Sequence, residues 1–589
     1  MEKQHNRGQD GAGLANIKFD VPPGARYISR HRSNSNKPIQ EIFDHVHGRF
    51  SDLTKGDQEL LSDPQWLKEH TPFSGELFLG HLRYGTYGGN SIEACHPFLR
   101  QNNWMTRNLV LAGNFNMTNV DEQFDLLVDL GQHPKKKADT VTVLEKIGHF
   151  LDEENEALFG KYKRLGYGNK EITEMISKNL DIQNILTRSA GNFDGGYTMC
   201  GLVGNGDAFV LRDPNGIRPA FYYKDDEVVV VASERPVIQT AFNLTSDQVS
   251  EVEPGHALIV KKDGGVSMDM IRQPGEKLSC SFERIYFSRG SDTDIYKERK
   301  ALGRLVVPRI LQAIDADLDN SVFSFIPNTA EVSFYGMVRG LEEFHSERKI
   351  VEIPRLGNDE EGLRKLLNER VRIEKVAIKD AKLRTFITQD SDRNELVAHV
   401  YDVTYGTIRR GKDNLVMIDD SIVRGTTLKQ SILRILDRLG PKKIVVVSSA
   451  PQIRYPDCYG IDMSLLQDFC VFQAALALLK DTKQEYILKE VYDLCVTDLG
   501  NLSQTNHVKK VYAPFTDDQL STKVGELLRP KDLNADLEII FQSIDALHEA
   551  CPDHKGDWYF SGNYPTHGGN RVVNKAYMNF FEGKRERAY

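Results

Sequence analysis

The stretch Val416-Met-Ile-Asp-Asp-Ser-Ile-Val-Arg-Gly-Thr-Thr427 decides how the second half of the chain folds. Residues 415–418 form a continuous apolar run, which is typical of a buried parallel strand. Two acidic residues and a short polar loop follow, and then apolar residues recur at helical spacing until Gly440-Pro441. A strand, a polar loop and a helix in this order place a ligand at the carboxyl edge of a parallel sheet.

The loop after the acidic pair has the chemistry of a phosphate site. The first amides of the helix and the positive end of its dipole favour an anion, and Gly425 lets the backbone approach it closely. The hydroxyl side chains that can donate hydrogen bonds are those of Ser421, Thr426 and Thr427. Asp419 and Asp420 would repel a phosphate, so we expect them to face sugar hydroxyls, directly or through Mg²⁺. Considered without the rest of the string, Asp419 and Asp420 have an alternative interpretation, in which they only cap the following helix from a turn at the end of the strand.

Composition restricts the class of protein. A chain of 589 residues exceeds one hydrophobic core, and its 40% hydrophobic and 27% charged residues are ordinary for a globular protein. The net charge of −9 gives no reason to expect nucleic-acid or anionic-membrane binding. The apolar runs are too short for a bilayer span, and we expect no secretory signal. The seven cysteines are scattered without a CxxC pair, so we expect a reduced, cytoplasmic protein without a disulfide framework or zinc site.

The pattern of secondary structure changes along the chain. Up to about residue 275, short β-like runs separated by turn residues predict antiparallel sheets, interrupted by a helical insertion at about 120–192. The predicted strands of this part are residues 76–81, 108–112, 197–203, 208–211, 227–232 and 256–260. From about residue 298, helices alternate with apolar strands, which predicts a parallel α/β sheet. Its predicted strands are residues 322–326, 415–418 and 444–448.

The 416–427 string resembles the motif with which type I phosphoribosyltransferases bind 5-phosphoribosyl-1-pyrophosphate (PRPP). Its Ser-Ile-Val-Arg-Gly-Thr-Thr portion resembles that of the amidophosphoribosyltransferases. The resemblance implies that Asp419 and Asp420 lie at the ribose hydroxyls and Mg²⁺, and that residues 421–427 hold the 5-phosphate. Arg424 lies within this loop, and a surface arginine is the alternative for it.

Two further segments resemble parts of such a site. Ser324-Phe-Ile-Pro-Asn-Thr-Ala-Glu331 resembles the pyrophosphate loop and puts Thr329 at the position of a metal-proximal hydroxyl, although Asn328 replaces the family's glutamate. Lys379-Asp-Ala-Lys-Leu-Arg-Thr-Phe-Ile387 resembles the flexible loop that closes over PRPP, which implies PRPP contacts for Lys379 and Arg384. This match is one residue short of the common pattern, and acidic residues replace its basic continuation. Closure would exclude water from an oxocarbenium-like centre.

Two strand–turn segments in the first half carry further candidate residues. Arg83, in Gly80-His-Leu-Arg-Tyr-Gly-Thr-Tyr-Gly88, can bind a carboxylate bidentately. Asn114, in Leu109-Val-Leu-Ala-Gly-Asn-Phe-Asn-Met-Thr-Asn119, can donate its amide to an oxyanion. Taken singly, each segment is only a strand followed by a turn.

Together these segments resemble the class II glutamine amidotransferase domain, which has the N-terminal-nucleophile hydrolase fold. The resemblance implies that Arg83 holds the glutamine α-carboxylate, that Asp139 accepts its α-ammonium and that Asn114 stabilises the oxyanion. Phe115 replaces the family's oxyanion glycine, whose role its backbone N–H can still fill. Arg7-Gly-Gln-Asp-Gly-Ala-Gly13 and Arg212-Asp-Pro-Asn-Gly-Ile-Arg-Pro219 also match family motifs, and the second can be a purely structural turn.

The nucleophile of that domain is missing from the sequence. The family uses a cysteine at the mature N-terminus, a few tens of residues before the Arg-Gly-Gln-Asp motif, and its own α-amine is the base. No cysteine precedes Cys95 here, and Cys95 has no free α-amine, so we interpret it as structural. Either the chain is a truncated form of a longer protein or its glutaminase is inactive. Truncation is favoured because the glutamine-binding residues are retained while the first strand of the fold is also absent.

The resemblance therefore implies an α/β and α+β protein with three parts. Residues 1–275 are expected to form an αββα glutaminase domain, residues 276–505 a phosphoribosyltransferase domain with a central parallel sheet, and residues 506–589 a C-terminal extension packed on both. The implied activity converts PRPP and glutamine-derived ammonia to 5-phosphoribosylamine, glutamate and pyrophosphate, the first step of purine synthesis. The alternatives are an ammonia-only phosphoribosyltransferase and a non-catalytic PRPP-sensing regulator.

The resemblance also implies cofactors and partners. Mg²⁺ is expected at Thr329, Asp419 and Asp420. No iron–sulfur cluster is expected, because residues 557–565 lack the CxxC of cluster-containing relatives and Cys458 lies one position away from a ligand site. A homo-oligomer inhibited by purine nucleotides is implied, with no nucleic-acid or membrane partner.

Overall fold

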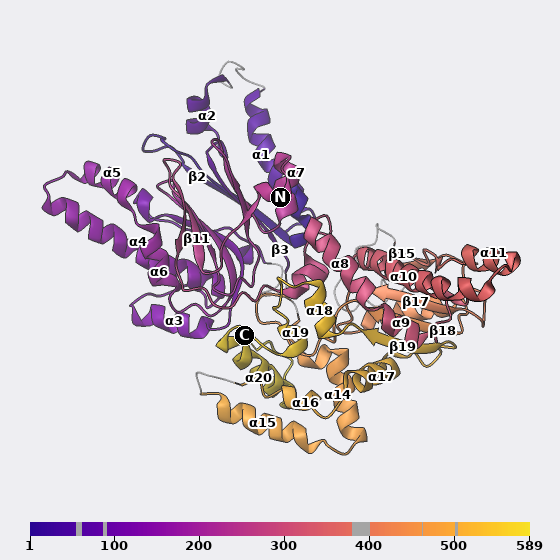
Figure 1. Ribbon diagram of the computed structural model, residues 1–589. Coiled ribbons are helices and arrows are strands. Elements are labelled where there is room, and N and C mark those ends of the chain that lie inside the picture. The colour runs from indigo at the N-terminus through magenta and orange to yellow at the C-terminus, as the bar shows by residue number, and fades with distance from the viewer. Residues whose placement is uncertain (55–61, 86–90, 380–400, 462, 501–504, 589) are drawn as a thin grey trace.

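The structure, a computed structural model, describes residues 1–54, 62–85, 91–379, 401–461, 463–500 and 505–588. Two halves, each built on β-sheet, lie side by side, and the C-terminal helices lie at their junction (Figure 1). The N-terminal half ends with β12 (Val266–Met270), and the C-terminal half begins with the π-type helical turn η6 (Glu283–Phe287). Among the described residues, no helix is both long and apolar enough to cross a membrane.

The N-terminal half contains two antiparallel sheets packed face to face. A three-stranded sheet has the order β2-β1-β3, and a six-stranded sheet has the order β12-β11-β7-β6-β5-β4. The strands of the first sheet are β1 (Gly11–Ile17), β2 (Ile28–Ser33) and β3 (Leu77–Arg83). Those of the second are β4 (Phe98–Arg100), β5 (Leu109–Met117), β6 (Gly195–Val203), β7 (Ala208–Arg212), β11 (His256–Val260) and β12. A small sheet of β8 (Phe221–Lys224), β9 (Val229–Ala232) and β10 (Ser250–Glu251) adjoins them, with α7 (Arg235–Phe242).

Three hydrophobic clusters divide this half into four layers, α, β, β and α. One face of β1 packs against α1 (Pro38–Thr54), with Leu14 against Ile42. Its other face packs against the second sheet, with Ile17 in a cluster with Val110. The far face of the second sheet is covered by helices α3 (Val120–Asp129), α4 (Asp139–Arg164), α5 (Asn169–Asn179) and α6 (Ile182–Ala190). The predicted αββα architecture is therefore confirmed, with α3–α6 as its second helical layer.

The C-terminal half is built on a five-stranded parallel sheet in the order β14-β13-β17-β18-β19. Its strands are β13 (Ser321–Phe325), β14 (Arg372–Ile373), β17 (Asn414–Asp419), β18 (Lys443–Ser448) and β19 (Asp536–Phe541). Alternate residues of β17 enter two different cores, because Leu415 and Met417 face one side and Val416 and Ile418 the other. Burial on both faces explains the continuous apolar runs that predict these strands.

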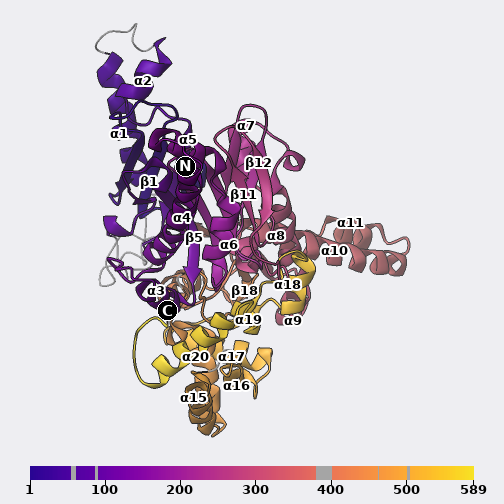
Figure 2. The same ribbon diagram turned by 90° about the vertical axis from the view of Figure 1, so that its left-hand side faces the viewer.

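Helices surround the parallel sheet and extend beyond it. They are α8 (Thr293–Leu305), α9 (Val307–Ala313), α10 (Glu331–Leu356), α11 (Glu360–Asn368), α13 (Leu433–Asp437), α14 (Cys470–Asp481), α15 (Tyr486–Asp498), α16 (Lys509–Tyr512), α17 (Asp517–Leu528), α18 (Ile544–Ala550), α19 (Trp558–Ser561) and α20 (His567–Phe581). A two-stranded ribbon of β15 (Ala377–Lys379) and β16 (Tyr401–Val403) lies beside the sheet. α10 and α11 project from the body in both views (Figures 1 and 2). Hydrogen bonds from Gly568 and Arg571 of α20 to Asp194 and Thr118 join the C-terminal helices to the N-terminal half.

The remaining elements are short. The 3₁₀ turns are η1 (Glu2–Arg7), η3 (Ile92–Ala94), η4 (Met105–Arg107), η5 (Ser246–Gln248) and η8 (Leu466–Asp468). A π-type turn, η7 (Leu428–Ile432), precedes α13, and a short helix, α2 (Pro64–His70), precedes β3. Together, η7 and α13 form the helix predicted after the 416–427 string.

Candidate functional site

The acidic pair and the loop after it lie where the strand order of the parallel sheet changes direction. From β13 the chain continues to β14 on one side and then to β17 on the other. The crevice outside the carboxyl ends of β13 and β17 is therefore a topological switch point, which is where open α/β sheets bind ligands. The two predicted segments, residues 324–331 and 416–427, each include the end of one of these strands.

The backbone of the acidic pair is fixed by the neighbouring strand. Ser449 donates its backbone N–H to the Asp419 carbonyl at 2.9 Å and its hydroxyl to the Asp420 carbonyl at 3.2 Å. The Asp420 N–H donates to the Asp419 carboxylate at 2.9 Å. The backbone that carries both side chains is therefore held at the end of β17 by hydrogen bonds from Ser449.

The two carboxyl groups bind protons more tightly than ordinary aspartates. Burial among protein atoms raises the pKa of Asp419 well above its usual value, and repulsion by Asp420 adds to this. Burial likewise raises the pKa of Asp420 to about 6, although the Ser421 and Thr329 hydroxyls favour its carboxylate. Two crowded acids of this kind are stabilised by a bound cation or by sugar hydroxyls.

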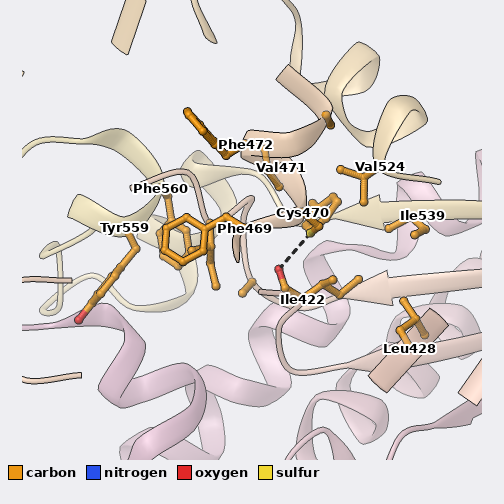
Figure 3. Close-up of a cluster of buried hydrophobic side chains, with 14 of the residues drawn as sticks. Ile422, Leu428, Phe469, Cys470, Val471, Phe472, Val524, Ile539, Tyr559 and Phe560 are labelled. Atoms are coloured by element: carbon orange, nitrogen blue, oxygen red, sulfur yellow. Dashed lines mark hydrogen bonds between the residues drawn. The ribbon is translucent and has the colours of Figure 1, made fainter. Parts of the chain in front are cut away.

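The loop is anchored from behind by the start of α14. The Cys470 N–H donates to the Val423 carbonyl at 2.9 Å, and the Cys470 thiol donates weakly to the Ile422 carbonyl at 4.0 Å (Figure 3). Ile422 is buried in the same apolar cluster. The loop is consequently held in place while its opposite side stays open.

Gly425 is required by the geometry of this loop. Its φ is +67°, a conformation that other residues adopt at a cost, and a Cβ there would lie 2.6 Å from Leu528 Cδ1. The Lys429 N–H donates to its carbonyl at 2.9 Å, which closes the first turn of η7. Thr426 and Thr427 are exposed at that turn. The loop thus presents hydroxyls and a helix N-terminus to solvent, as a phosphate site requires.

Ser421 and Arg424 are directed differently. The Ser421 hydroxyl donates to the Asp420 carboxylate at 3.3 Å. The Arg424 guanidinium lies 3.6 Å from the Asp468 carboxylate of η8, with its side chain 44% exposed. Asp468 also pairs with Arg585, at 3.0 Å. Arg424 is therefore only weakly tethered and remains accessible from the loop.

Thr329, in the loop after β13, and Lys379, at the end of β15, also lie near the acidic pair. Thr329 follows β13 and lies close enough to lower the pKa of Asp420, and the Pro327–Asn328 peptide before it is cis. Lys379, the last residue of β15, is close enough to lower the pKa of Asp419. The rest of the predicted closing loop, including Arg384, lies outside the described residues.

Three residues that the sequence analysis did not identify also border the acidic pair. Burial raises the pKa of Tyr401 to about 12, and the charges of Asp419 and Asp420 add to this shift. The pKa of Tyr286 in η6 is raised by burial and by the same carboxylates. Arg299 is buried and donates to carbonyls of η6 and the loop after it, at 2.8 Å to Arg284. Nothing local in the sequence links these residues to the loop.

The acidic pair fits Mg²⁺. Within the described part of the chain, no group of three or more His, Cys, Asp or Glu side chains could hold a metal. Mg²⁺ commonly uses only one or two protein carboxylates and completes its shell with water and substrate phosphates. Asp419 and Asp420, with the Thr329 hydroxyl beside them, supply oxygen donors of that kind.

The candidate residues of the N-terminal half converge on a pair of stacked histidines. The rings of His81 and His96 lie 4.3 Å apart. His81 Nε2 contacts the Gly113 carbonyl at 3.1 Å, and the Gly113 N–H donates to His96 Nδ1 at 3.3 Å. His96 Nε2 lies 3.4 Å from the Thr140 hydroxyl. The pair therefore joins the end of β3, the middle of β5 and the first turn of α4, which carry Arg83, Asn114 and Asp139.

Electrostatics keep this histidine pair neutral. Burial, with a smaller contribution from the charge of Arg83, lowers the pKa of His81 to about 4, although the contact with the Gly113 carbonyl opposes this shift. Burial lowers the pKa of His96 well below its usual value, with additional repulsion from His81 and Arg83. Burial also raises the pKa of Asp139, against the hydrogen bonds from Thr140. A buried carboxyl group of that kind is stabilised by an incoming ammonium group.

Asn114 and Phe115 point to opposite faces of β5, as neighbouring strand residues do. Phe115 belongs to the core under α4, and its ring centroid lies 5.9 Å from that of His96. Asn114 faces the C-terminal half, where a Cβ on Gly460 would lie 3.8 Å from its Oδ1. Among the described residues, the Asn114 side-chain amide has no hydrogen-bond partner, so it remains available to a ligand.

Cys95 has the surroundings of a structural residue. It is fully buried, and its sulfur lies 3.8 Å from the carbonyl oxygens of Ser33 and Ser91. Burial raises the pKa of its thiol, which opposes the thiolate that a nucleophile requires.

The 212–219 segment is a self-bonded turn that also reaches the other half. Asp213 accepts backbone N–H groups of the turn, from Ile217 at 3.0 Å and Arg218 at 3.2 Å. Arg218 is 2% exposed and donates from Nε to the Tyr459 carbonyl at 3.0 Å. The turn therefore has a structural role in joining the two halves.

Comparison with known proteins relates the chain to one group of enzymes. No family model matches it. A curated amidophosphoribosyltransferase of Pasteurella multocida strain Pm70 is 26% identical over 474 residues, 78% of this chain and 77% of that protein. One of Bacillus subtilis strain 168 is 28% identical over 471 residues, 79% of this chain and 78% of that protein.

A solved structure shares the fold over nearly the whole chain. It is the glutamine PRPP amidotransferase from B. subtilis complexed with ADP and GMP, with a TM-score of 0.58 at 22% identity. The superposition covers 96% of this chain and 92% of that one. The fold, the order of the motifs and the sequence matches agree: the chain is a homologue of the amidophosphoribosyltransferases.

Proposed function

We propose that the chain is an amidophosphoribosyltransferase, which converts PRPP and ammonia derived from glutamine to 5-phosphoribosylamine, glutamate and pyrophosphate. One observation carries the proposal. The acidic pair, Thr329 and the glycine-containing loop meet at the switch point of a parallel sheet, in a chain related to such enzymes along most of its length.

In this proposal the substrate spans the crevice. The 5-phosphate binds the amides and hydroxyls of residues 421–427, with Arg424 nearby. Asp419 and Asp420 accept hydrogen bonds from the ribose hydroxyls. Lys379, which lies close enough to Asp419 to lower its pKa, contributes a positive charge for the pyrophosphate.

The reaction replaces one bond at C1 of the ribose. The nitrogen of ammonia forms a bond to C1 and loses one proton, while the C1–O bond breaks and its electron pair leaves with pyrophosphate. Mg²⁺, held by Asp419, Asp420 and Thr329, would neutralise part of the charge on pyrophosphate. The protein groups orient the sugar and exclude water, because water would otherwise capture the electron-deficient C1.

The N-terminal half is the proposed source of ammonia. Arg83 would bind the glutamine α-carboxylate, Asp139 its α-ammonium, and Asn114 with the Phe115 N–H the oxyanion. Hydrolysis also needs a thiolate beside a free amine, and no cysteine precedes the buried Cys95 in this sequence. A second candidate function follows for the polypeptide of residues 1–589, namely phosphoribosylamine synthesis from free ammonia alone.

A steady-state assay separates these functions. Pyrophosphate release is measured with PRPP and Mg²⁺, with ammonium chloride at alkaline pH or with glutamine at neutral pH. Product from both sources supports the full activity, and product from ammonia alone supports the second candidate. No product from either source contradicts both.

The remaining parts of the proposal concern regulation and setting. Purine nucleotides are proposed inhibitors, because the structural neighbour is a complex with ADP and GMP. A homo-oligomer is proposed from the resemblance alone. A cytoplasmic location is proposed because all seven cysteines are free, which suits a reducing compartment.

A further inference from the structure

Glu283 lies at the junction of the halves and joins two arginines of the N-terminal half. Its carboxylate receives two hydrogen bonds from Arg7, at 2.5 Å and 3.1 Å. Arg218 donates to it at 3.4 Å, and the Ser288 hydroxyl donates at 3.0 Å. Glu283 is 4% exposed, so the ion pairs are shielded from solvent. A paired arginine fork of this kind fixes position as well as charge.

Arg7 is connected to Arg83, the proposed ligand of the glutamine carboxylate, through the backbone of the residues that follow it. The next residue, Gly8, packs so closely on β3 that a Cβ would lie 2.5 Å from the Arg83 backbone nitrogen. The Asp10 N–H donates to the Arg83 carbonyl at 3.0 Å. Movement of Arg7 would therefore displace the backbone that carries the Arg83 side chain.

The residues beside Arg7 are held between the same two regions. The Tyr84 hydroxyl donates to the Asn6 carbonyl at 2.7 Å, from the residue that follows Arg83. The Asn6 amide donates to the Glu234 carboxylate at 3.1 Å and to the Phe287 carbonyl, at the end of η6, at 3.4 Å. The segment of Asn6, Arg7 and Gly8 therefore lies between η6 on one side and the end of β3 on the other.

Arg218 connects Glu283 to a second part of the proposed glutamine site, the region around Asn114. It donates to the Tyr459 carbonyl at 3.0 Å, next to Gly460, which lies against Asn114. The neighbouring Cys458 carbonyl accepts the Asn116 amide at 2.7 Å. Glu283 is thus the shared partner of Arg7, which leads to Arg83, and of Arg218, which leads to Asn114.

We propose that Glu283 is a positioning residue of the glutamine site. Through Arg7 it fixes the end of β3 that carries Arg83, and through Arg218 it fixes the Tyr459–Gly460 segment that lies against Asn114. The assignment of the site to glutamine rests on the proposed function. The same residue begins η6, whose Tyr286 borders the PRPP carboxylates. Glu283 therefore also connects the glutamine site to the element that faces PRPP.

The test measures amide hydrogen exchange across residues 77–85 in the full chain and its Glu283→Gln variant. This substitution keeps the size of the side chain but removes the carboxylate that the two buried arginines share. We expect the Leu82 and Arg83 amides to exchange about tenfold faster, because opening of this strand end becomes easier. We expect Glu283→Asp, which restores the charge on a shorter side chain, to recover part of the protection.

A neighbouring ion pair provides the matched control. Glu298→Gln removes another mostly buried carboxylate, whose ion-pair partner is Arg284. This variant should leave exchange across residues 77–85 at the wild-type rate. If Glu283→Gln does not fold, Arg7→Lys keeps the charge but loses the two-donor fork, and it is expected to increase exchange at the same amides.

Titration with L-glutamine by calorimetry distinguishes the inference from the proposed function. We expect Glu283→Gln to weaken glutamine binding about tenfold relative to wild type. Unchanged exchange at residues 77–85, or an equal increase throughout the chain, would overturn the positioning role. If exchange responds as expected but wild-type protein does not bind glutamine, the positioning role stands and the assignment of the site to glutamine is wrong.

Discussion

Replacing Gly425 by alanine should disturb the phosphate loop without changing a charge or a hydrogen-bonding group. At φ +67° an alanine costs about 1 kcal/mol relative to glycine. The added Cβ would lie 2.6 Å from Leu528 Cδ1 and 2.7 Å from Cδ2, and Leu528 is 6% exposed. Because that side chain has little room to move, overpacking adds about 1–3 kcal/mol. We expect a total cost of about 2–4 kcal/mol, partly as lost stability and partly as a displaced loop.

Gly411→Ala is the matched control, since Gly411 has φ +69° and, among the described atoms, nothing within 4 Å of the added Cβ. This variant should lose only about 1 kcal/mol in urea denaturation and keep the wild-type KM for PRPP in the ammonia assay. Gly425→Ala should lose more stability and raise that KM roughly tenfold, which corresponds to about 1.4 kcal/mol of binding. Equal stability losses in the two variants, with equal KM values, would refute the assignment of this loop to the phosphate.

Three further predictions test other parts of the proposal. Asp420→Asn should raise the KM for PRPP about tenfold or more in the ammonia assay, because hydrogen bonds to a charged group contribute roughly 1.5–3 kcal/mol; a change below twofold would contradict its role at the ribose. Arg83→Lys should weaken glutamine binding about tenfold by calorimetry, since lysine cannot form the two-donor contact. Burial opposes ionisation of Glu283, but its ion pairs, above all with Arg7, hold its pKa at about 2, below the unfolded value of about 4.5. Its contribution of roughly 3 kcal/mol to the free energy of unfolding is therefore present above pH ~4.5 and lost as the pH falls toward 2. Urea denaturation at a series of pH values should show a smaller loss of stability over this range in Glu283→Gln than in the unchanged chain.

Local sequence predicts the strands that are buried on both faces. β13, β17 and β18 match their predicted ranges to within a residue or so, because both of their faces enter apolar cores. β1 (Gly11–Ile17) is equally buried but is missing from the predicted strands, since small residues fill the narrow space between α1 and the second sheet. β19 is also missing from them, because only three of its six residues are fully buried.

In the candidate sites too, residues that are close together in the sequence could be predicted, and residues that only the tertiary fold brings together could not. Asp419, Asp420 and the glycine loop are consecutive, so strand, loop and helix signals identify them together. Tyr401 and Arg299 reach the acidic pair only through the tertiary fold, and neither has a local pattern that indicates it. His81 is different, because it stands two residues before Arg83 on the same face of a strand, and this spacing could have included it.

The structure makes glutamine binding and glutamine hydrolysis separable in this polypeptide. The binding groups belong to folded elements: Arg83 ends β3, Asn114 lies within β5, and Asp139 begins α4. The stacked histidines connect these elements through contacts that involve no cysteine side chain. Hydrolysis, in contrast, needs a thiolate, and Cys95 is buried with a raised pKa. The polypeptide should therefore bind glutamine in calorimetry, and a Cys95→Ser variant should release glutamate at the same rate as the unchanged polypeptide. Glutamate release that persists in a Cys95→Ser variant would show that another group in these 589 residues acts as the nucleophile.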